Sequence, residues 1–211
     1  MLVEALSTKA SLRNTTPISP EADDWLKEFS MNQQNNKEII LPQRTSWEIR
    51  LEEQEFLKWR SALNEWCLFF DGASKGNPGQ AGGGGVILEP SGKIHLSYAW
   101  GLGIAPNNQA ELLALWQGLT QVRNLNVQKI TIIGDSRLIV QALHNRKEPK
   151  DIKLAHLYRK VLLLLTHFRN HKVYHVLRNL NGLADTEANH GMLLSKSHLI
   201  VNGNNSNHSL P

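Results

Sequence analysis

The acidic residues of this chain are few beyond residue 65, and four of them occupy unusual positions. Between residues 66 and 201 the sequence has eight Asp and Glu against fifteen Lys and Arg. Four of the acids lie at the ends of apolar strands or inside the first turn of apolar helices: Asp71, Glu111, Asp135 and Asp185. A carboxylate beside buried surface is unfavourable unless a partner compensates its charge. We expect that partner to be a divalent cation.

Together the four carboxylates predict one kind of chemistry. Without a cation they would repel one another and take up protons, whereas two Mg²⁺ ions would make them a hard oxygen-ligand site suited to in-line phosphoryl transfer. Taken singly, each acid has an ordinary explanation. Asp71 could close a strand, Asp135 could cap a helix, and Glu111 could interact with a helix dipole.

The elements that must position these acids follow from the apolar periodicity. Five strands are expected at about 66–70, 82–88, 93–102, 129–134 and 172–177, and helices at 107–125, 136–144, 152–168 and 182–194. The order βββαβααβα implies an α/β fold with a five-stranded mixed sheet flanked by helices. Right-handed connections can place the first and fourth strands side by side, which would make Asp71 and Asp135 neighbours.

The remaining sequence suggests three regions. Residues 1–64 form an N-terminal extension, expected to be partly disordered with a helix at about 46–63, capped by Ser46 and carrying an apolar stripe. Residues 65–201 form the main domain, and residues 202–211 form a polar tail expected to be disordered. The run Gly82–Gly85 is interpreted as close strand packing, because no helix and no Lys-Ser/Thr follow it as in a phosphate loop.

Charge and composition restrict the class of protein. Residues 1–65 carry a formal charge of −3 and residues 66–211 carry +7. A basic body around an acidic cluster indicates a polyanionic ligand beside a metal site, although an ordinary solvated basic surface would have the same charge. The single Cys67 excludes a disulfide framework, and no apolar run is long enough to cross a membrane. We expect an intracellular protein of the nucleus or cytoplasm.

Four sequence blocks in this order resemble the type 1 ribonuclease H family, especially the archaeal-like domains attached to plant retroelement reverse transcriptases. The blocks are Phe70-Asp-Gly-Ala-Ser-Lys-Gly-Asn-Pro-Gly79, Asn107-Asn-Gln-Ala-Glu111, Gly134-Asp-Ser136 and Asn181-Gly-Leu-Ala-Asp185. The resemblance covers about residues 66–194. It implies a ribonuclease H-like fold and endonucleolytic hydrolysis of the RNA strand of an RNA/DNA hybrid, leaving a 5′-phosphate and a 3′-hydroxyl.

The resemblance also implies roles for individual residues. Asp71, Glu111, Asp135 and Asp185 would be the catalytic metal ligands for two Mg²⁺ ions, with Mn²⁺ as a possible substitute and Asp71 as the bridge. The substrate would be bound by Gly72, Asn77, Asn107, Asn108, Ser136, Arg178 and Asn181. Asn suits contacts in the minor groove because its amide both donates and accepts hydrogen bonds. Partners would be the RNA/DNA hybrid and a reverse transcriptase or other polyprotein parts.

The sequence departs from the family pattern at three places. Arg178 stands where the family often has a His, Pro106 stands where it often has Ser or Thr, and the segment 143–152 is too short for a basic protrusion. Hybrid binding would then use Arg146, Lys147, Lys150 and Lys153. Two other functions stay open: a catalytically silent nucleic-acid-binding module of a retroelement-derived protein, and another nuclease or integrase on the same fold.

Overall fold

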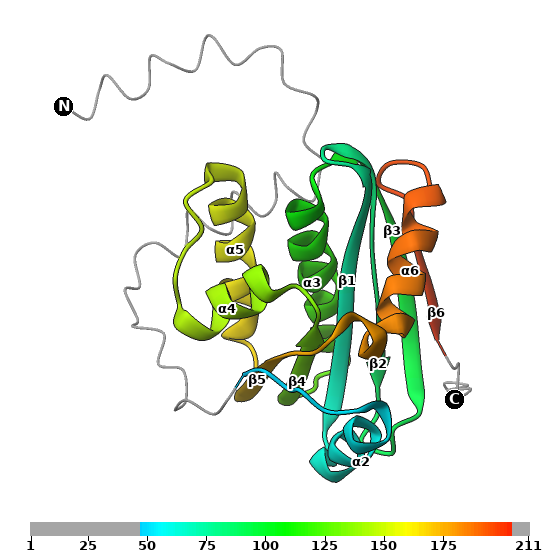
Figure 1. Cartoon of the computed structure of the whole chain (residues 1–211), viewed down its shortest axis with the longest axis vertical. Helices are drawn as coiled ribbons and strands as arrows, with labels where there is room; N and C mark the ends of the chain where they lie inside the picture. Colours follow the sequence, from blue (N-terminus) through cyan, green and yellow to red (C-terminus); the bar gives the residue numbers. More distant parts are fainter. Residues whose placement is uncertain (1–46, 204–211) are drawn as a thin grey trace, which may run out of the picture. The chain divides into compact units, whose positions relative to one another are not determined.

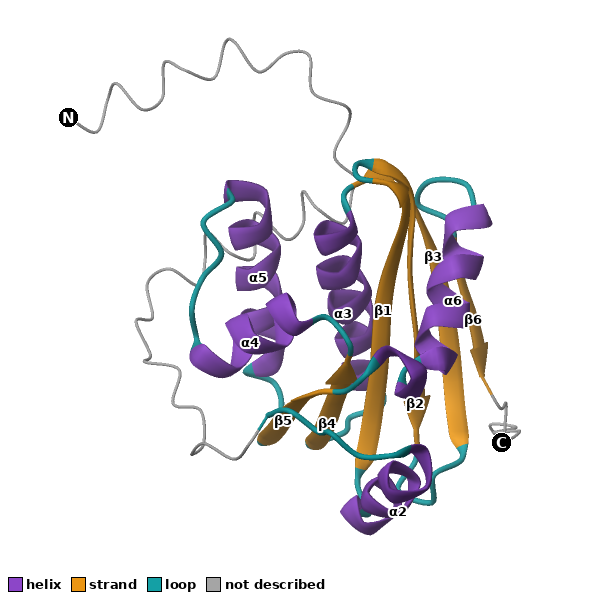
Figure 2. Ribbon diagram, in the orientation of Figure 1, coloured by secondary structure: helices purple, strands orange, loops and turns teal. Residues whose placement is uncertain are grey.

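The computed structural model describes residues 47–203, which all lie within one compact unit spanning residues 42–211. Its centre is a six-stranded mixed sheet with helices on both faces (Figures 1 and 2). The elements in chain order are α2 (Glu53–Leu63), β1 (Trp66–Gly76), β2 (Gly79–Leu88), β3 (Ile94–Ala105), α3 (Asn107–Asn124), β4 (Lys129–Gly134), α4 (Arg137–Asn145), α5 (Ile152–Leu165), β5 (Asn170–His175), the 3₁₀ turn η2 (Arg178–Leu180), α6 (Gly182–Leu193) and β6 (Leu199–Gly203).

The strands lie in the order β5-β4-β1-β2-β3-β6. The meander β1-β2-β3 is antiparallel, and β1, β4 and β5 run parallel to one another because helices connect them. The predicted mixed α/β architecture and the pairing of the first strand with the fourth are therefore confirmed.

The predicted number of strands is wrong by one. The structure adds β6, which pairs antiparallel with β3 from Leu199 to Gly203. Asn202 and Gly203, assigned to a disordered tail, belong to this strand, whereas residues 204–211 lie outside the described part of the chain. Pairing with an exposed strand edge depends on distant residues, so the local polar composition does not report it.

The two faces of the sheet carry separate apolar clusters. In β1, Leu68 and Phe70 point to the face covered by α3, α4 and α5, while Cys67 and Phe69 point to the face covered by α2 and α6. This alternation follows from the period of two along a strand. Burial raises the pKa of the Cys67 thiol to about 12, as expected for a core residue.

The glycine run in β2 allows a helix to lie directly on the sheet. A Cβ on Gly82 would stand 2.1 Å from the main-chain nitrogen of Met192, and one on Gly84 would stand 2.3 Å from that of Ala188. Both neighbours belong to α6. The interpretation of this run as close packing is confirmed, with a helix as the neighbour.

The N-terminal extension is only partly helical where it is described. Helix α2 begins at Glu53, after Glu52 as its N-cap, so the predicted helix start near residue 46 is wrong. Trp47–Ile49 is extended, with Glu48 forming a parallel β-bridge to His175. Ser46 and the region before it lie outside the described residues. Within residues 47–203, no helix has both the length and the apolar character needed to cross a bilayer.

Candidate active site

Two of the predicted acids come from neighbouring parallel strands. Phe69 of β1 is in register with Ile133 of β4, and each is followed two residues later by an acid, Asp71 and Asp135. Asp71 lies within β1 rather than at its end, because the strand continues to Gly76, and its side chain is buried. Asp135 comes directly after β4. The carboxylates therefore meet at one place on the sheet, as the sequence predicts.

Glu111 joins this pair from α3. It is the fifth residue of the helix, so the expectation that it lies in the first turn is wrong. Its carboxylate accepts hydrogen bonds from Asn107 Nδ2, at 2.9 Å, and from the Ser136 hydroxyl. The second contact links α3 to the turn that follows Asp135.

Asp185 lies in the first turn of α6, as predicted. Its carboxylate accepts from Arg178 Nη2 at 2.5 Å and from Asn189 Nδ2 at 2.8 Å. Asp185 does not itself line the pocket formed by the other three acids, but Arg178 and Asn189 do. It is therefore linked to the pocket through these two side chains.

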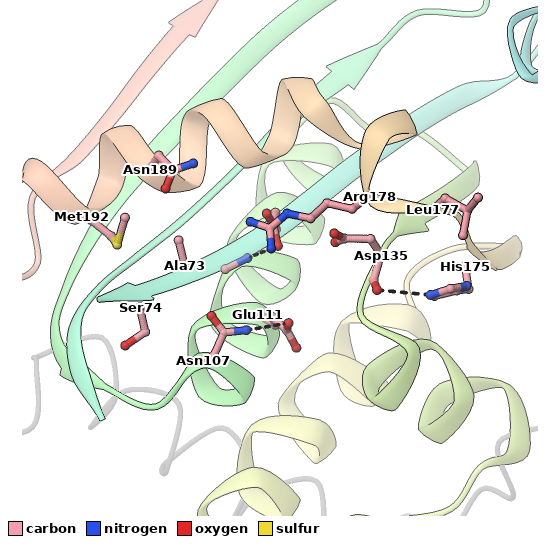
Figure 3. Close-up of a pocket in the computed structure, with 12 residues that line it drawn as sticks. Ala73, Ser74, Asn107, Glu111, Asp135, His175, Leu177, Arg178, Asn189 and Met192 are labelled. Carbon is pink, nitrogen blue, oxygen red and sulfur yellow. Dashed lines mark hydrogen bonds between the residues drawn. The ribbon is translucent and has the colours of Figure 1, made fainter. Parts of the chain in front are cut away.

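The pocket has a volume of about 470 Å³ and is shown in Figure 3. Six of the predicted site residues line it: Asp71, Gly72, Asn107, Glu111, Asp135 and Arg178. The pocket is also lined by His175 and by five residues that the sequence does not identify: Ala73, Ser74, Leu177, Asn189 and Met192. The position of Asn189 could have been predicted, since it follows Asp185 by one helical turn and so lies on the same face of the helix.

Several predicted substrate-binding residues have structural contacts instead. Asn181 is fully buried, and its Nδ2 donates to the main-chain oxygen of Phe70 and to Asp135 Oδ1, both at 3.0 Å. Ser136 is also buried and donates to Glu111. Gly72 is buried against α3. In the structure these three residues hold the acids and the helix in place, and their direct contact with a substrate stays a prediction.

The other predicted contacts remain accessible to different degrees. Asn77 is exposed, and its Oδ1 accepts from the main-chain nitrogen of Asn107 at 3.2 Å. Asn108 is partly buried, and its Oδ1 is a buried acceptor without a hydrogen bond. Arg178 has a side chain that is 75% exposed at the mouth of the pocket. These positions could meet a ligand that lies across the acids.

The acids are crowded enough to change their proton affinity. Burial, followed by the charge of Asp135, raises the pKa of Asp71 to about 8. Burial is also the main cause that raises the pKa of Glu111 to about 7, against the opposing effect of its hydrogen bond from Ser136. Groups with such raised pKa values are common at functional sites.

The donor set fits a divalent cation in type. All four groups are hard oxygen donors, and their accumulated negative charge is relieved either by protons or by a cation. Among residues 47–203, however, no three His, Cys, Asp or Glu side chains already form a group that could hold a metal ion. Three of the four carboxylates each accept a hydrogen bond from at least one of the side chains of Asn107, Ser136, Asn181 and Arg178.

Comparison with known proteins agrees with this geometry. Residues 69–191 match the family model described as Reverse transcriptase-like. The chain is 36% identical over 124 residues to Ribonuclease HI of Halobacterium salinarum, covering 59% of this chain and 62% of that protein. It thus spans less than two thirds of this curated relative.

Two solved structures show the same fold. The crystal structure of RNase H1 from Halobacterium salinarum is similar with a TM-score of 0.59 and 34% identity, covering 61% of this chain and 97% of that chain. LC11-RNase H1, solved in complex with an RNA/DNA hybrid, is similar with a TM-score of 0.58 and 26% identity. The match covers 61% of this chain and 96% of that chain.

Proposed function

The chain belongs to the reverse transcriptase-like family of ribonuclease H-like domains, and on that premise we propose that it hydrolyses the RNA strand of RNA/DNA hybrids. The observation that carries this proposal is the meeting of Asp71 and Asp135 on adjacent parallel strands with Glu111 beside them. The raised pKa values of Asp71 and Glu111 support it, because they reflect negative charge gathered at one buried place.

The four acids would hold two Mg²⁺ ions, or Mn²⁺ in their place. When bound, these ions would supply an activated water and stabilise the charge that develops on the phosphate. Asp71 is buried, and the charges of Asp135, Glu111 and Asp185 all act on its carboxylate, which suits it to hold a cation. Asn181 would hold Asp135 in place through its amide, and Ser136 and Asn107 would hold Glu111.

The substrate would lie across the mouth of the pocket. Arg178 is exposed there and can make a charge-assisted contact to a phosphate of the strand being cut. Asn107 lines the pocket, and the exposed Asn77 accepts a hydrogen bond from the main-chain nitrogen of Asn107, so the amides of both would meet the 2′-hydroxyls that distinguish RNA from DNA. The cut would leave a 5′-phosphate and a 3′-hydroxyl, and a reverse transcriptase or other polyprotein part is a partner consistent with the family.

A second function is favoured by two observations. Arg178 already neutralises Asp185, and the acids of the described region form no ready-made metal group. A module with these features could bind a hybrid without cutting it. This alternative predicts binding that does not depend on a divalent cation.

One assay separates the two functions. The full chain is incubated with a labelled RNA/DNA hybrid, double-stranded DNA and single-stranded RNA, in Mg²⁺ or EDTA. The proposed enzyme cuts only the hybrid, and the cut disappears in EDTA and in Asp135→Asn. Asp151→Asn is the matched control, since Asp151 caps α5 and Asn is also a good N-cap. Binding of the hybrid without cleavage would support the silent module.

A further inference from the structure

The segment Trp47–Ile49 adds one bridge to the open edge of the sheet. The main-chain nitrogen of Ile49 donates to His175 O at 2.9 Å, and that of His175 donates to Trp47 O at 2.7 Å. Strand β5 is the edge strand, so the segment pairs main-chain groups that no other strand within residues 47–203 pairs. Figure 1 shows it in blue beside the end of β5. The segment lies outside residues 69–191, the part that matches the family.

The same segment surrounds the His175 side chain. The ring of Trp47 meets the ring of His175 edge-on, with centroids 6.1 Å apart, and Glu48 Oε1 lies 3.9 Å from His175 Nδ1. On its other side, His175 Nε2 lies 3.2 Å from the main-chain oxygen of Asp135 (Figure 3). Since a carbonyl oxygen only accepts, Nε2 carries the proton of this hydrogen bond. His175 therefore connects the segment to the main chain of a predicted catalytic acid.

The segment also reaches the helix that follows Asp135. Arg137, the first residue of α4, has its Nη2 at 3.5 Å from Glu48 Oε1 and its guanidinium carbon 5.8 Å from the centre of the Trp47 ring. Near the end of α4, the ring of His144 lies 6.0 Å from that of Trp47. Trp47 and Glu48 thus join β5, the strand that pairs with β4, to α4, the helix that begins directly after Asp135 and Ser136.

We propose that Trp47 and Glu48 are positioning residues for Asp135, acting through His175 and through α4. This inference rests on the proposed function of the site. Asn181 holds the carboxylate of Asp135, and His175 holds its main chain, so the segment fixes the second of two attachments. Displacements of about 1 Å in a catalytic group can reduce the rate on the order of 100-fold. Contacts that fix the turn carrying Asp135 should therefore have a measurable effect on the rate of cleavage.

The test uses the full chain with Trp47→Ala, Trp47→Phe and Phe56→Leu. Phe56 belongs to the same N-terminal region but packs on Phe69, in the apolar cluster beneath α2. We expect Trp47→Ala to lower kcat on the order of tenfold with KM for the hybrid nearly unchanged. Trp47→Phe restores most of kcat, because an aromatic ring remains against His175. Phe56→Leu lowers Tm but leaves kcat unchanged well below Tm.

Two activity results would overturn the proposal. In one, Trp47→Ala keeps the kcat of the unchanged chain. In the other, Phe56→Leu loses as much kcat as Trp47→Ala at a similar fall in Tm, which would show that the segment acts only through general stability.

Amide hydrogen exchange provides a readout that does not depend on cleavage. In the metal-free protein, Trp47→Ala is expected to speed exchange on the order of tenfold in the peptide covering residues 134–140, and Phe56→Leu is not. Unchanged exchange in Trp47→Ala would contradict the proposal. If the unchanged chain does not cut the hybrid, the proposed function fails while the exchange result still decides whether the segment holds this turn.

Discussion

Gly72 of β1 lies against the main chain of Glu111, so closely that a Cβ on Gly72 would stand 2.1 Å from the Glu111 nitrogen. This contact lets α3 cross β1 one residue after Asp71. It explains why an acid on a helix and an acid on a strand meet in the same pocket. In the Asp-Gly pair of the first sequence block, Asp71 therefore supplies a carboxylate, and Gly72 leaves the space that the main chain of Glu111 occupies.

The first prediction concerns this contact. Gly72→Ala must push α3 away from β1, and overpacking of this kind costs about 1–3 kcal/mol. We expect a lower Tm and a loss of hybrid cleavage that persists at temperatures where the variant is folded. Thermal unfolding and cleavage assays measure both effects.

Gly182→Ala is the matched control, because a Cβ on Gly182 meets nothing within 4 Å and lies at the start of α6. It should keep or slightly raise Tm. A Gly72→Ala variant with normal activity would show that the close approach is not needed.

The second prediction concerns Arg178 at the mouth of the pocket. Arg178→Gln removes a positive charge that pairs with Asp185, so a divalent cation should bind more tightly and the hybrid more weakly. Exposed pairs contribute about 0.2–1 kcal/mol, which corresponds to changes of roughly up to fivefold. Mn²⁺ titration by calorimetry and KM for the hybrid report the two effects.

Arg159→Gln serves as the control for Arg178, since Arg159 also forms an exposed ion pair, with Glu148, away from the pocket. Arg159→Gln should change neither the affinity for Mn²⁺ nor KM for the hybrid. Weaker cation binding in Arg178→Gln would contradict the electrostatic explanation.

The third prediction is a pH dependence of stability in EDTA. The folded-state pKa values of Asp71 and Glu111, about 8 and about 7, lie above the ordinary values of their unfolded forms. The folded protein therefore binds more protons than the unfolded chain between about pH 4 and 8, and its stability falls as pH rises through this range. The fall should be of the order of a few kcal/mol.

Urea unfolding at pH 5 and pH 8 measures this effect. Asp71→Asn should flatten the profile and, at pH 8 without metal, stabilise the fold, because it removes a buried charge. A free energy of unfolding that rises from pH 5 to pH 8 would contradict the crowding of the acids.

The fourth prediction tests whether α2 belongs to the folded domain. Phe56 is 3% exposed and packs against Phe69 and Trp59. Phe56→Ala leaves a cavity and should lower the free energy of unfolding by about 3–5 kcal/mol. Leu57→Ala, at a position that is 44% exposed, should cost much less. Equal effects of both substitutions would show that α2 is not docked as described.

The sequence predicted the mixed architecture because its strands and helices are strongly periodic. The pairing of β1 with β4 followed from the handedness of crossover connections, and this placed Asp71 beside Asp135. Glu111 was expected to reach the same edge from its place on the helix that packs on the sheet, but the handedness rule does not fix its distance from Asp71. That distance depends on the close approach at Gly72, which only three-dimensional packing reveals.

Other features were missed for identifiable reasons. Trp47, Ile49 and Leu51 alternate with a period of two, which is typical of an extended segment and is a signal that the helix begins later than residue 46. Ser136 and Asn181 are polar residues beside acids, and sequence alone does not distinguish a ligand contact from a buried hydrogen bond to a carboxylate. Burial decides that question.

The most direct test of the shared carboxylate site is cleavage of a labelled RNA/DNA hybrid in Mg²⁺ by the unchanged chain and by Asp71→Asn, compared under conditions where both are folded. We expect the unchanged chain to cut only the RNA strand and Asp71→Asn to lose at least about 100-fold in rate, since the variant removes the central charged oxygen donor. Cleavage by Asp71→Asn at the rate of the unchanged chain would contradict the account.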